Sequence, residues 1–295
     1  PSSAASDVYK RQAQVLAAGS GVRAHVQIDN RYESTPSVLK LLVMILAVLC
    51  VVVSLGALFW LDRLGGYRRR VGARTRWARR LRPSPIDLVV TAVLGVWTLL
   101  GAGTPDDGYI LNMGRTAGSF GYLSDYYRFY GIPEAPFDWY YAFLGHWSAL
   151  SPALLWMLVP QLVAGLASWF VLSRVLLPRL GGAVSRSRWA MWSAALVFAA
   201  FWLPFCSGLR SESVIVLGSL VSWWAAEKAI ATRALLPAAL AAIAAGFTLA
   251  LAPQGLIGVA ILIVAARPLL HILLVRRREE GLAPLVAPIV AAGVL

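Results

Sequence analysis

Long apolar runs follow one another along most of this 295-residue chain, and they decide what it can fold into. Hydrophobic residues make up 59% of the sequence, above the roughly half that soluble domains contain. In a bilayer no water satisfies backbone N–H and C=O groups, so runs of this kind are confined to helices. The sequence therefore predicts an all-α polytopic membrane protein.

Eight of the runs are interpreted as membrane spans. Several contain about 18 residues, the short end for a helix that crosses a hydrocarbon layer of about 30 Å. The eighth begins near residue 283 and is too short to cross before Leu295, so we expect the protein to continue beyond it. The complete spans are predicted at residues 38–61, 86–103, 150–173, 189–206, 213–232, 235–251 and 255–275.

The residues before the first span divide into two predicted parts. Residues 1–12, which include "DVYKRQ", follow neither a helical nor a strand period and are interpreted as a scar of sequencing or assembly. In residues 13–36, apolar residues alternate with polar ones from Val22 to Ile28, as in a strand with one buried face. This segment is predicted to end an extracytoplasmic β-rich domain, and residues 37–295 to form the transmembrane domain.

Charge sets the predicted orientation. The formal net charge is +13, and the excess lies in short connections between spans, above all in the arginine-rich residues 62–85. Such connections stay in the cytoplasm, so we expect a multi-pass protein of the plasma membrane with the acidic connection 104–149 on the extracytoplasmic side. Contact with anionic lipid is the alternative role for these arginines. Because the charge follows topology, membrane lipid is an expected partner and nucleic acid is not.

The segment "GTPDDGYILNMGR", residues 103–115, places Asp106 and Asp107 side by side just after a predicted span. Neighbouring carboxylates suit a general base beside a group that positions a substrate. The alternative is structural, because Thr104, Pro105 and an aspartate are typical of a helix start. Downstream, residues 122–147 crowd aromatic rings among carboxylates, a pattern that favours sugar binding over a simple interfacial aromatic belt.

Two further segments interrupt apolar runs with polar groups. In "PFCSGLRSES", residues 204–213, Arg210 and Glu212 could hold a phosphate at a helix N-terminus, with a solvated hairpin as the alternative. In "LAPQGL", residues 251–256, Gln254 could contact a ligand, with a plain turn as the alternative. The sequence contains no metal-binding or nucleotide-binding motif, so no metal and no cofactor are expected and a membrane-borne sugar donor fits best.

In order, "DDGYILNM", "YYRFYGIPEAPFDWYY", "LPFCSGLRSES" and "LAPQGL" resemble the first membrane half of the Emb arabinofuranosyltransferases of mycobacteria, the ethambutol targets, over about residues 20–295. The resemblance implies a truncated GT-C glycosyltransferase fold. It implies transfer of arabinofuranose from decaprenyl-phosphate arabinose to the growing arabinan of arabinogalactan or lipoarabinomannan. A homodimer or a heterodimer with a paralogue, and an acyl carrier protein, are the protein partners that it implies.

The resemblance also assigns roles to single residues. Asp106 would deprotonate the acceptor hydroxyl, with Asp107 as its partner. Arg210 would lie near the donor phosphate. Glu212 and Gln254, which their own segments single out, complete the predicted substrate-binding set. Tyr109, Met113 and Glu134 would line the donor and ethambutol pocket. The family segment often reads "FNNGLRPE", so the replacement of its two asparagines and its proline by Cys206, Ser207 and Ser211 removes the amide contacts implied there.

Two other functions stay open from the sequence. Another GT-C glycosyltransferase that uses polyprenyl-phosphate mannose or glucose would show the same acidic connection. A transporter half is disfavoured, because transport sites place ionisable residues near the centres of spans, whereas here the charges concentrate in connections and at span ends.

Overall fold

The computed structural model describes residues 37–67, 83–120, 123–125, 132–133, 137–282, 284 and 286. The predicted scar and the β-rich segment lie outside the described residues, as do most of the arginine-rich connection, Glu134 and nearly all of the span predicted from residue 283.

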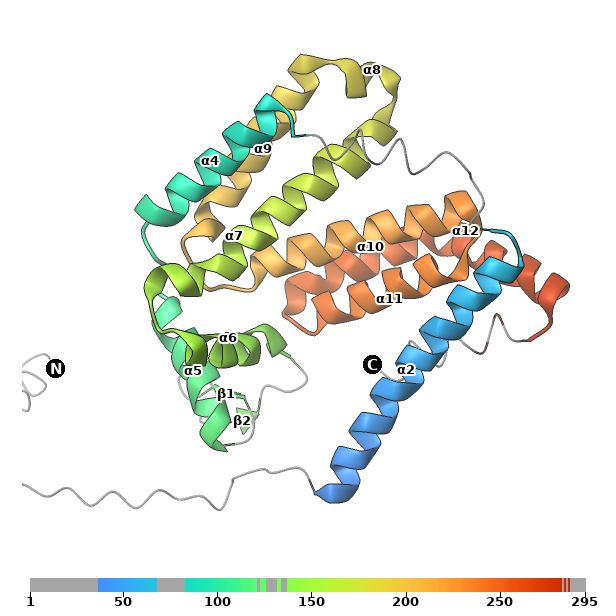
Figure 1. Cartoon of the computed structure of the whole chain (residues 1–295), viewed down its shortest axis with the longest axis horizontal. Helices are drawn as coiled ribbons and strands as arrows, with labels where there is room; N and C mark the ends of the chain where they lie inside the picture. The colour runs from blue at the N-terminus through green and yellow to red at the C-terminus, as the bar shows by residue number, and fades with distance from the viewer. Residues whose placement is uncertain are drawn as a thin grey trace, which may run out of the picture. The chain divides into compact units, whose positions relative to one another are not determined.

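Each of the seven complete predicted spans coincides with a helix, and the all-α fold is confirmed (Figure 1). Among the described residues, five helices are long and apolar enough to cross a membrane: α2, α9, α10, α7 with its continuation to Leu180, and α12 with the turn before it. α4 and α11 contain 16 and 15 residues and are shorter than such spans. The bounds are α2 (Val38–Leu64), α4 (Pro85–Leu100), α7 (Leu154–Val171), α9 (Arg188–Cys206), α10 (Glu212–Thr232), α11 (Leu235–Leu249) and α12 (Leu256–Glu280).

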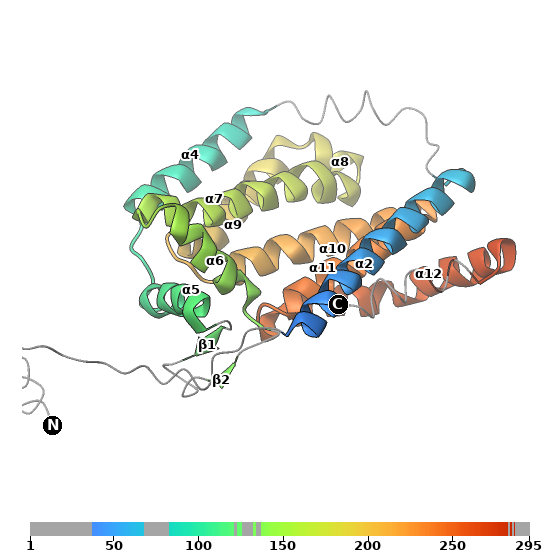
Figure 2. The same ribbon diagram turned by 60° about the horizontal axis from the view of Figure 1, so that its bottom comes forward.

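Residues 104–149, predicted to form an outer loop, are largely helical where the structure describes them. The prediction of a loop is corrected accordingly. α5 (Asp107–Phe120) and α6 (Trp139–Leu150) pack against each other beside the start of α7 (Figures 1 and 2). They cross closely at Gly114 and Gly145, where a side chain on either glycine would meet the backbone of the other helix. Between them, β1 (Ser124–Asp125) and β2 (Ile132–Pro133) form a short antiparallel pair.

Several helix ends are fixed by side chains that reach across to a neighbour. Ser84 and Asp87 form a reciprocal capping box at the start of α4, which satisfies N–H groups that have no partner inside the helix. Asp87 also accepts hydrogen bonds from Trp169 Nε1 at 2.8 Å and from Arg174, which lies in the π-turn η1 (Leu172–Leu176) after α7. The chain then continues through the 3-10 turn η2 (Leu177–Leu180) and the short helix α8 (Gly182–Arg186) to α9.

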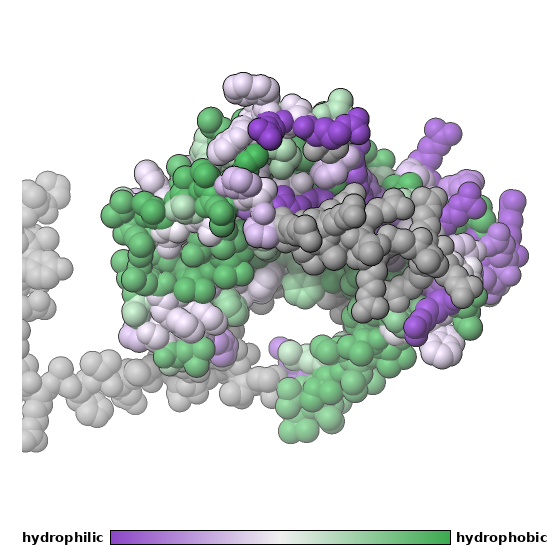
Figure 3. Space-filling model, turned by 45° about the horizontal axis from the view of Figure 1, so that its top comes forward, coloured by the Kyte–Doolittle hydropathy of each residue, from purple (hydrophilic) through white to green (hydrophobic). Residues whose placement is uncertain are grey.

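The helix ends separate into two groups. At one end, Asp62 of α2 accepts hydrogen bonds from the backbone N–H groups of Leu235 and Leu236, both at 2.9 Å, and forms an ion pair with Arg276 of α12. At the other end, the start of α5 meets the connection between α9 and α10. Figure 3 shows apolar side chains over much of the visible face, with hydrophilic side chains gathered along its upper and right-hand edges.

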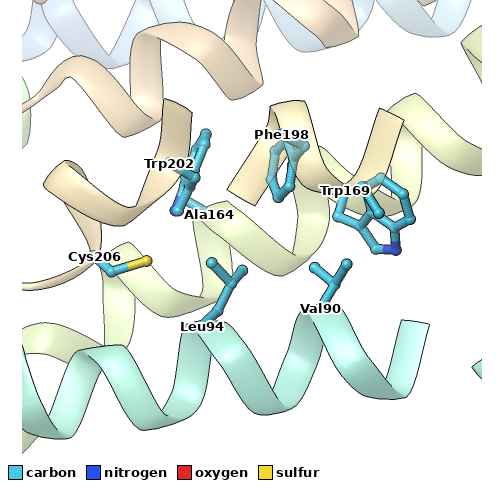
Figure 4. Packing of buried hydrophobic residues seen from close by; sticks show 8 residues of the cluster. Val90, Leu94, Ala164, Trp169, Phe198, Trp202 and Cys206 are labelled. Atoms are coloured by element: carbon cyan, nitrogen blue, oxygen red, sulfur yellow. The ribbon is translucent and has the colours of Figure 1, made fainter. Parts of the chain in front are cut away.

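The main apolar core lies between α4, α7 and α9. Val90 and Leu94 of α4 face Ala164 and Trp169 of α7 and Phe198, Trp202 and Cys206 of α9 (Figure 4). Trp202 is fully buried and fits against Gly165, where an added Cβ would lie 2.5 Å from the indole nitrogen. This core joins the three helices along much of their length, and the candidate site lies where α4 and α9 end.

Candidate functional site

Asp107 has a structural position at the start of α5. Its carboxylate accepts hydrogen bonds from the backbone N–H of Thr104 at 2.8 Å and from the Thr104 hydroxyl at 2.6 Å. It also accepts one from the backbone N–H of Leu209, at 2.8 Å, in the connection between α9 and α10. The helix-start interpretation of this aspartate therefore fits its geometry, and the same carboxylate ties two distant segments together.

Gly208 allows these two segments to approach. A Cβ on Gly208 would lie 2.7 Å from Thr104 Cγ2 and 3.3 Å from Asp107 Oδ1, closer than ordinary packing allows. The absence of a side chain at this glycine therefore brings Arg210 next to the start of α5.

Asp106 faces Arg210. One oxygen of its carboxylate lies 3.6 Å from a guanidinium nitrogen of Arg210, and the side chains of Asp106 and Arg210 are 32% and 44% exposed. The two adjacent aspartates thus have different surroundings. Asp107 is held by three donors, whereas Asp106 is partly open and faces a cation.

Arg210 also pairs with Glu212, at 2.6 Å, in the first turn of α10. Burial by itself lowers the pKa of Arg210, but the Glu212 and Asp106 carboxylates outweigh burial and hold this pKa above its ordinary value. The guanidinium is therefore a permanent positive charge with a partly exposed face. The second oxygen of Glu212 is buried and has no hydrogen-bond partner among the described residues.

Gln161 fixes the backbone of this segment from α7. Its side chain is fully buried, its amide nitrogen donates to the carbonyl oxygen of Arg210 at 2.5 Å, and its amide oxygen accepts from the hydroxyl of Ser213. Buried amides of this kind are costly unless both ends are satisfied, and here both are. Gln161 therefore determines where the Arg210 backbone lies.

Tyr141 of α6 completes the group. Burial raises the pKa of Tyr141, a hydrogen bond with Ser211 lowers it, and the neighbouring Asp138, Tyr109 and Glu212 raise it further. The phenol is therefore neutral near pH 7 and can donate or accept a hydrogen bond. Its neighbours come from the first turn of α5 and from the starts of α6 and α10.

The other residues predicted for the site have mixed placements. Tyr109 lies in the first turn of α5 near Tyr141. Met113 is only 1% exposed and belongs to the interior packing. Gln254 is exposed in the 3-10 turn η3 (Pro253–Gly255), next to the buried Leu251, which packs in the same cluster as Tyr140 and Ile215. Glu134 lies outside the described residues.

An apolar groove adjoins the charged group. It has a volume of about 360 Å³ and lies between α6, α7 and α10. Its α10 wall is made by Val214 and Leu217, which follow Arg210 and Glu212 in the sequence. Four aromatic residues of α6 line the opposite wall: Trp139, Tyr140, Phe143 and Trp147. Among the residues that the structure describes, no group of three histidine, cysteine or carboxylate side chains could hold a metal ion.

Comparison with known proteins places this geometry in a family. The sequence profile described as "Mycobacterial cell wall arabinan synthesis protein" matches residues 35–295. The chain belongs to this arabinan synthesis family. It is 45% identical over 276 residues to probable arabinosyltransferase B of Mycolicibacterium smegmatis and 46% identical over 272 residues to probable arabinosyltransferase C of Mycobacterium tuberculosis.

The fold is that of a solved structure. The chain matches arabinosyltransferase EmbB from Mycobacterium smegmatis, determined by single-particle cryo-EM, with a TM-score of 0.83 and 45% identity over 90% of its length. The GT-C membrane fold expected from the resemblance is confirmed by this match. The chain spans about a quarter of the length of these relatives, 25% of each of the two sequences and 26% of the solved chain.

The three residues expected to differ from the family segment fall in buried positions. Cys206, Ser207 and Ser211 are 0%, 4% and 3% exposed. Ser211 hydrogen-bonds Tyr141, so this serine has a partner within the site. Cys206 packs in the apolar core next to Trp202 (Figure 4).

The sequence reasoning missed Gln161 and Tyr141. A lone amide in the apolar run "MLVPQLVAG" is a signal that could have found Gln161, because polar residues inside a membrane segment are expensive and need a partner. Tyr141 carries no such signal, since it is one of several aromatic residues in "FDWYYAF".

Proposed function

We propose that this chain forms part of the active site of a membrane arabinosyltransferase, which moves arabinofuranose from decaprenyl-phosphate arabinose to a growing cell-wall arabinan. The observation that carries the proposal is the 3.6 Å pair of Asp106 and Arg210, both partly exposed, beside an apolar groove. The names of the arabinosyltransferase relatives support the sugar.

In the proposed reaction Asp106 takes the proton from the acceptor hydroxyl. The hydroxyl oxygen forms the new bond to the anomeric carbon of arabinose as the bond from that carbon to the phosphate oxygen breaks. Decaprenyl phosphate leaves with the bonding electrons, and the charge of Arg210 stabilises the departing phosphate. No nucleotide-binding loop is needed, because the lipid phosphate is already a good leaving group.

The apolar groove supports a lipid-linked donor. Leu217 follows Glu212 by five residues, or about 7.5 Å along a helix, so the charged group and the apolar wall lie on consecutive turns of α10. A phosphate at Arg210 would leave its polyprenyl chain at the mouth of the aromatic groove formed by α6. A soluble sugar donor would have no use for that surface.

The test uses the full-length protein with decaprenyl-phosphate arabinose and a short arabinan acceptor. We expect Asp106→Asn to reduce transfer by about 10²- to 10⁴-fold, the usual contribution of a general base, while the unfolding temperature and donor binding stay unchanged. Unchanged transfer would exclude Asp106 as the base. A wild type that is active only with a mannose or glucose donor would favour the alternative GT-C enzymes.

Asp107→Asn is the matched comparison. In this variant an amide nitrogen replaces one of the two carboxylate oxygens. That nitrogen cannot accept a hydrogen bond from Thr104 or Leu209, so the interaction between α5 and the connection before α10 weakens. We expect this variant to lower the unfolding temperature as well as transfer. Loss of transfer at full stability would instead assign Asp107 a direct catalytic role.

A further inference from the structure

A second cavity lies at the opposite end of the helices from the proposed active site. It has a volume of about 360 Å³ and is lined by Ile230 and Arg233 at the end of α10 and by Arg267, Pro268, His271 and Ile272 of α12. We refer to it as the Arg233–Arg267 groove. Neither the sequence motifs nor the proposed transfer reaction uses these residues.

The groove contains positive charges that have no ion-pair partner among the described residues. Arg233, Arg267 and His271 are exposed, and no carboxylate among the described residues forms an ion pair with them. Glu279, which lines a small adjoining cavity with Arg233, already accepts a hydrogen bond from the Tyr67 hydroxyl at 2.7 Å. The two exposed guanidinium groups are therefore available to an anion from outside the described part of the chain.

The surroundings of the groove are aliphatic rather than polar. Along α12, Ile263, Val264, Leu270 and Leu274 are 69%, 85%, 56% and 54% exposed. Arginine can place its charged head at the membrane surface while its stem and its neighbours stay in the hydrocarbon. A groove lined by cationic groups, with exposed aliphatic residues along the same helix, matches a phosphate head joined to acyl chains.

The depth of the groove agrees with a headgroup position. Ile272 packs with Leu58 and Leu235, so this part of α12 lies level with the end of α2 and the start of α11. Arg267 precedes Ile272 by five residues, about 7.5 Å along the helix. Arg233 lies two residues before Leu235. Arg233 and Arg267 thus lie within about two helical turns of the level of Leu235, the start of α11, which the charge pattern predicts to be cytoplasmic.

We propose that the Arg233–Arg267 groove binds one anionic phospholipid, with the phosphate between the two arginines and the acyl chains on the aliphatic surface of α12. Basic pockets between helices on the cytoplasmic side of a membrane recognise such headgroups. The proposal does not rest on the arabinosyltransferase activity.

The test compares lipid retention by the full-length protein in mixed micelles of phosphatidylglycerol and phosphatidylcholine, read by native mass spectrometry. Wild type is expected to retain phosphatidylglycerol preferentially. The double variant Arg233→Gln and Arg267→Gln is expected to lose that preference by about 10- to 30-fold, the effect of two basic side chains at a lipid surface. The double variant Arg233→Lys and Arg267→Lys keeps the positive charge and is expected to retain most of the preference for phosphatidylglycerol.

The control is Arg186→Gln with Arg188→Gln, which removes the same charge from two exposed arginines between α8 and α9. It is expected to leave the preference unchanged. An equal loss in this control would attribute lipid retention to total charge and overturn the site. So would an unchanged preference in the groove variant, which is expected to keep the wild-type unfolding temperature because its two side chains are exposed.

Discussion

At the residue scale, one buried amide decides the position of the cation in the proposed site. Gln161→Leu leaves the carbonyl of Arg210 and the hydroxyl of Ser213 without their partner, at a cost of about 1–3 kcal/mol for each buried group. We expect the variant to lower the unfolding temperature and to lower kcat more than it raises KM, because Arg210 would act mainly on the departing phosphate. Thermal unfolding and transfer kinetics on the full-length protein measure both effects.

A double-variant cycle separates this interaction from general damage to the helix. Since Gln161 and Ser213 contact each other directly, Ser213→Ala in the Gln161→Leu background should cost less than Ser213→Ala alone. Additive losses in the unfolding temperature would contradict a specific role for this pair.

At the element scale, the crossing of α5 and α6 sets the position of Asp106 and Tyr141. Gly145→Ala would push a Cβ onto the backbone of Gly114, and overpacking of this kind costs about 1–3 kcal/mol. We expect a lower unfolding temperature and reduced transfer. Gly246→Ala is the control, because a Cβ on Gly246 of α11 meets no atom within 4 Å. Equal behaviour of the two variants would show that the crossing is not tightly packed.

At the scale of the whole molecule, a buried ion pair joins helices that are far apart in the sequence. Arg276 and Asp62 have side chains that are 1% and 2% exposed, and Asp62 also caps the start of α11. Arg276→Met would leave a buried carboxylate without its counter-ion, so we expect a loss of about 3–5 kcal/mol in unfolding free energy. Arg277→Met, which changes the exposed neighbour, should have little effect.

Adding Asp62→Asn to Arg276→Met gives the decisive comparison. The second change removes the uncompensated charge, so part of the lost stability should return. A further loss of stability, measured by thermal unfolding in detergent, would mean that Asp62 acts mainly through its backbone contacts with Leu235 and Leu236.

The sequence predicted the structure best where one property, hydropathy, forms a repeated pattern along the chain. Hydropathy located seven helices, because a run of apolar residues can satisfy its backbone in lipid only as a helix. It described residues 104–149 as a loop, since α5 is too polar to resemble a span and its helical start depends on the cap formed by Thr104 and Asp107. The motif order also indicated the family, which the profile match bears out.

The chain's own sequence therefore determined its helices, its family and the charged residues of the candidate site. Only the tertiary structure showed how the surroundings of the two adjacent aspartates differ, because that difference lies in Leu209 and Arg210, about 100 residues further along the chain. Only the fold brought Gln161 under Arg210 and Arg233 beside Arg267. Hydropathy and motif order are properties of neighbours in sequence, whereas these contacts join distant segments through packing.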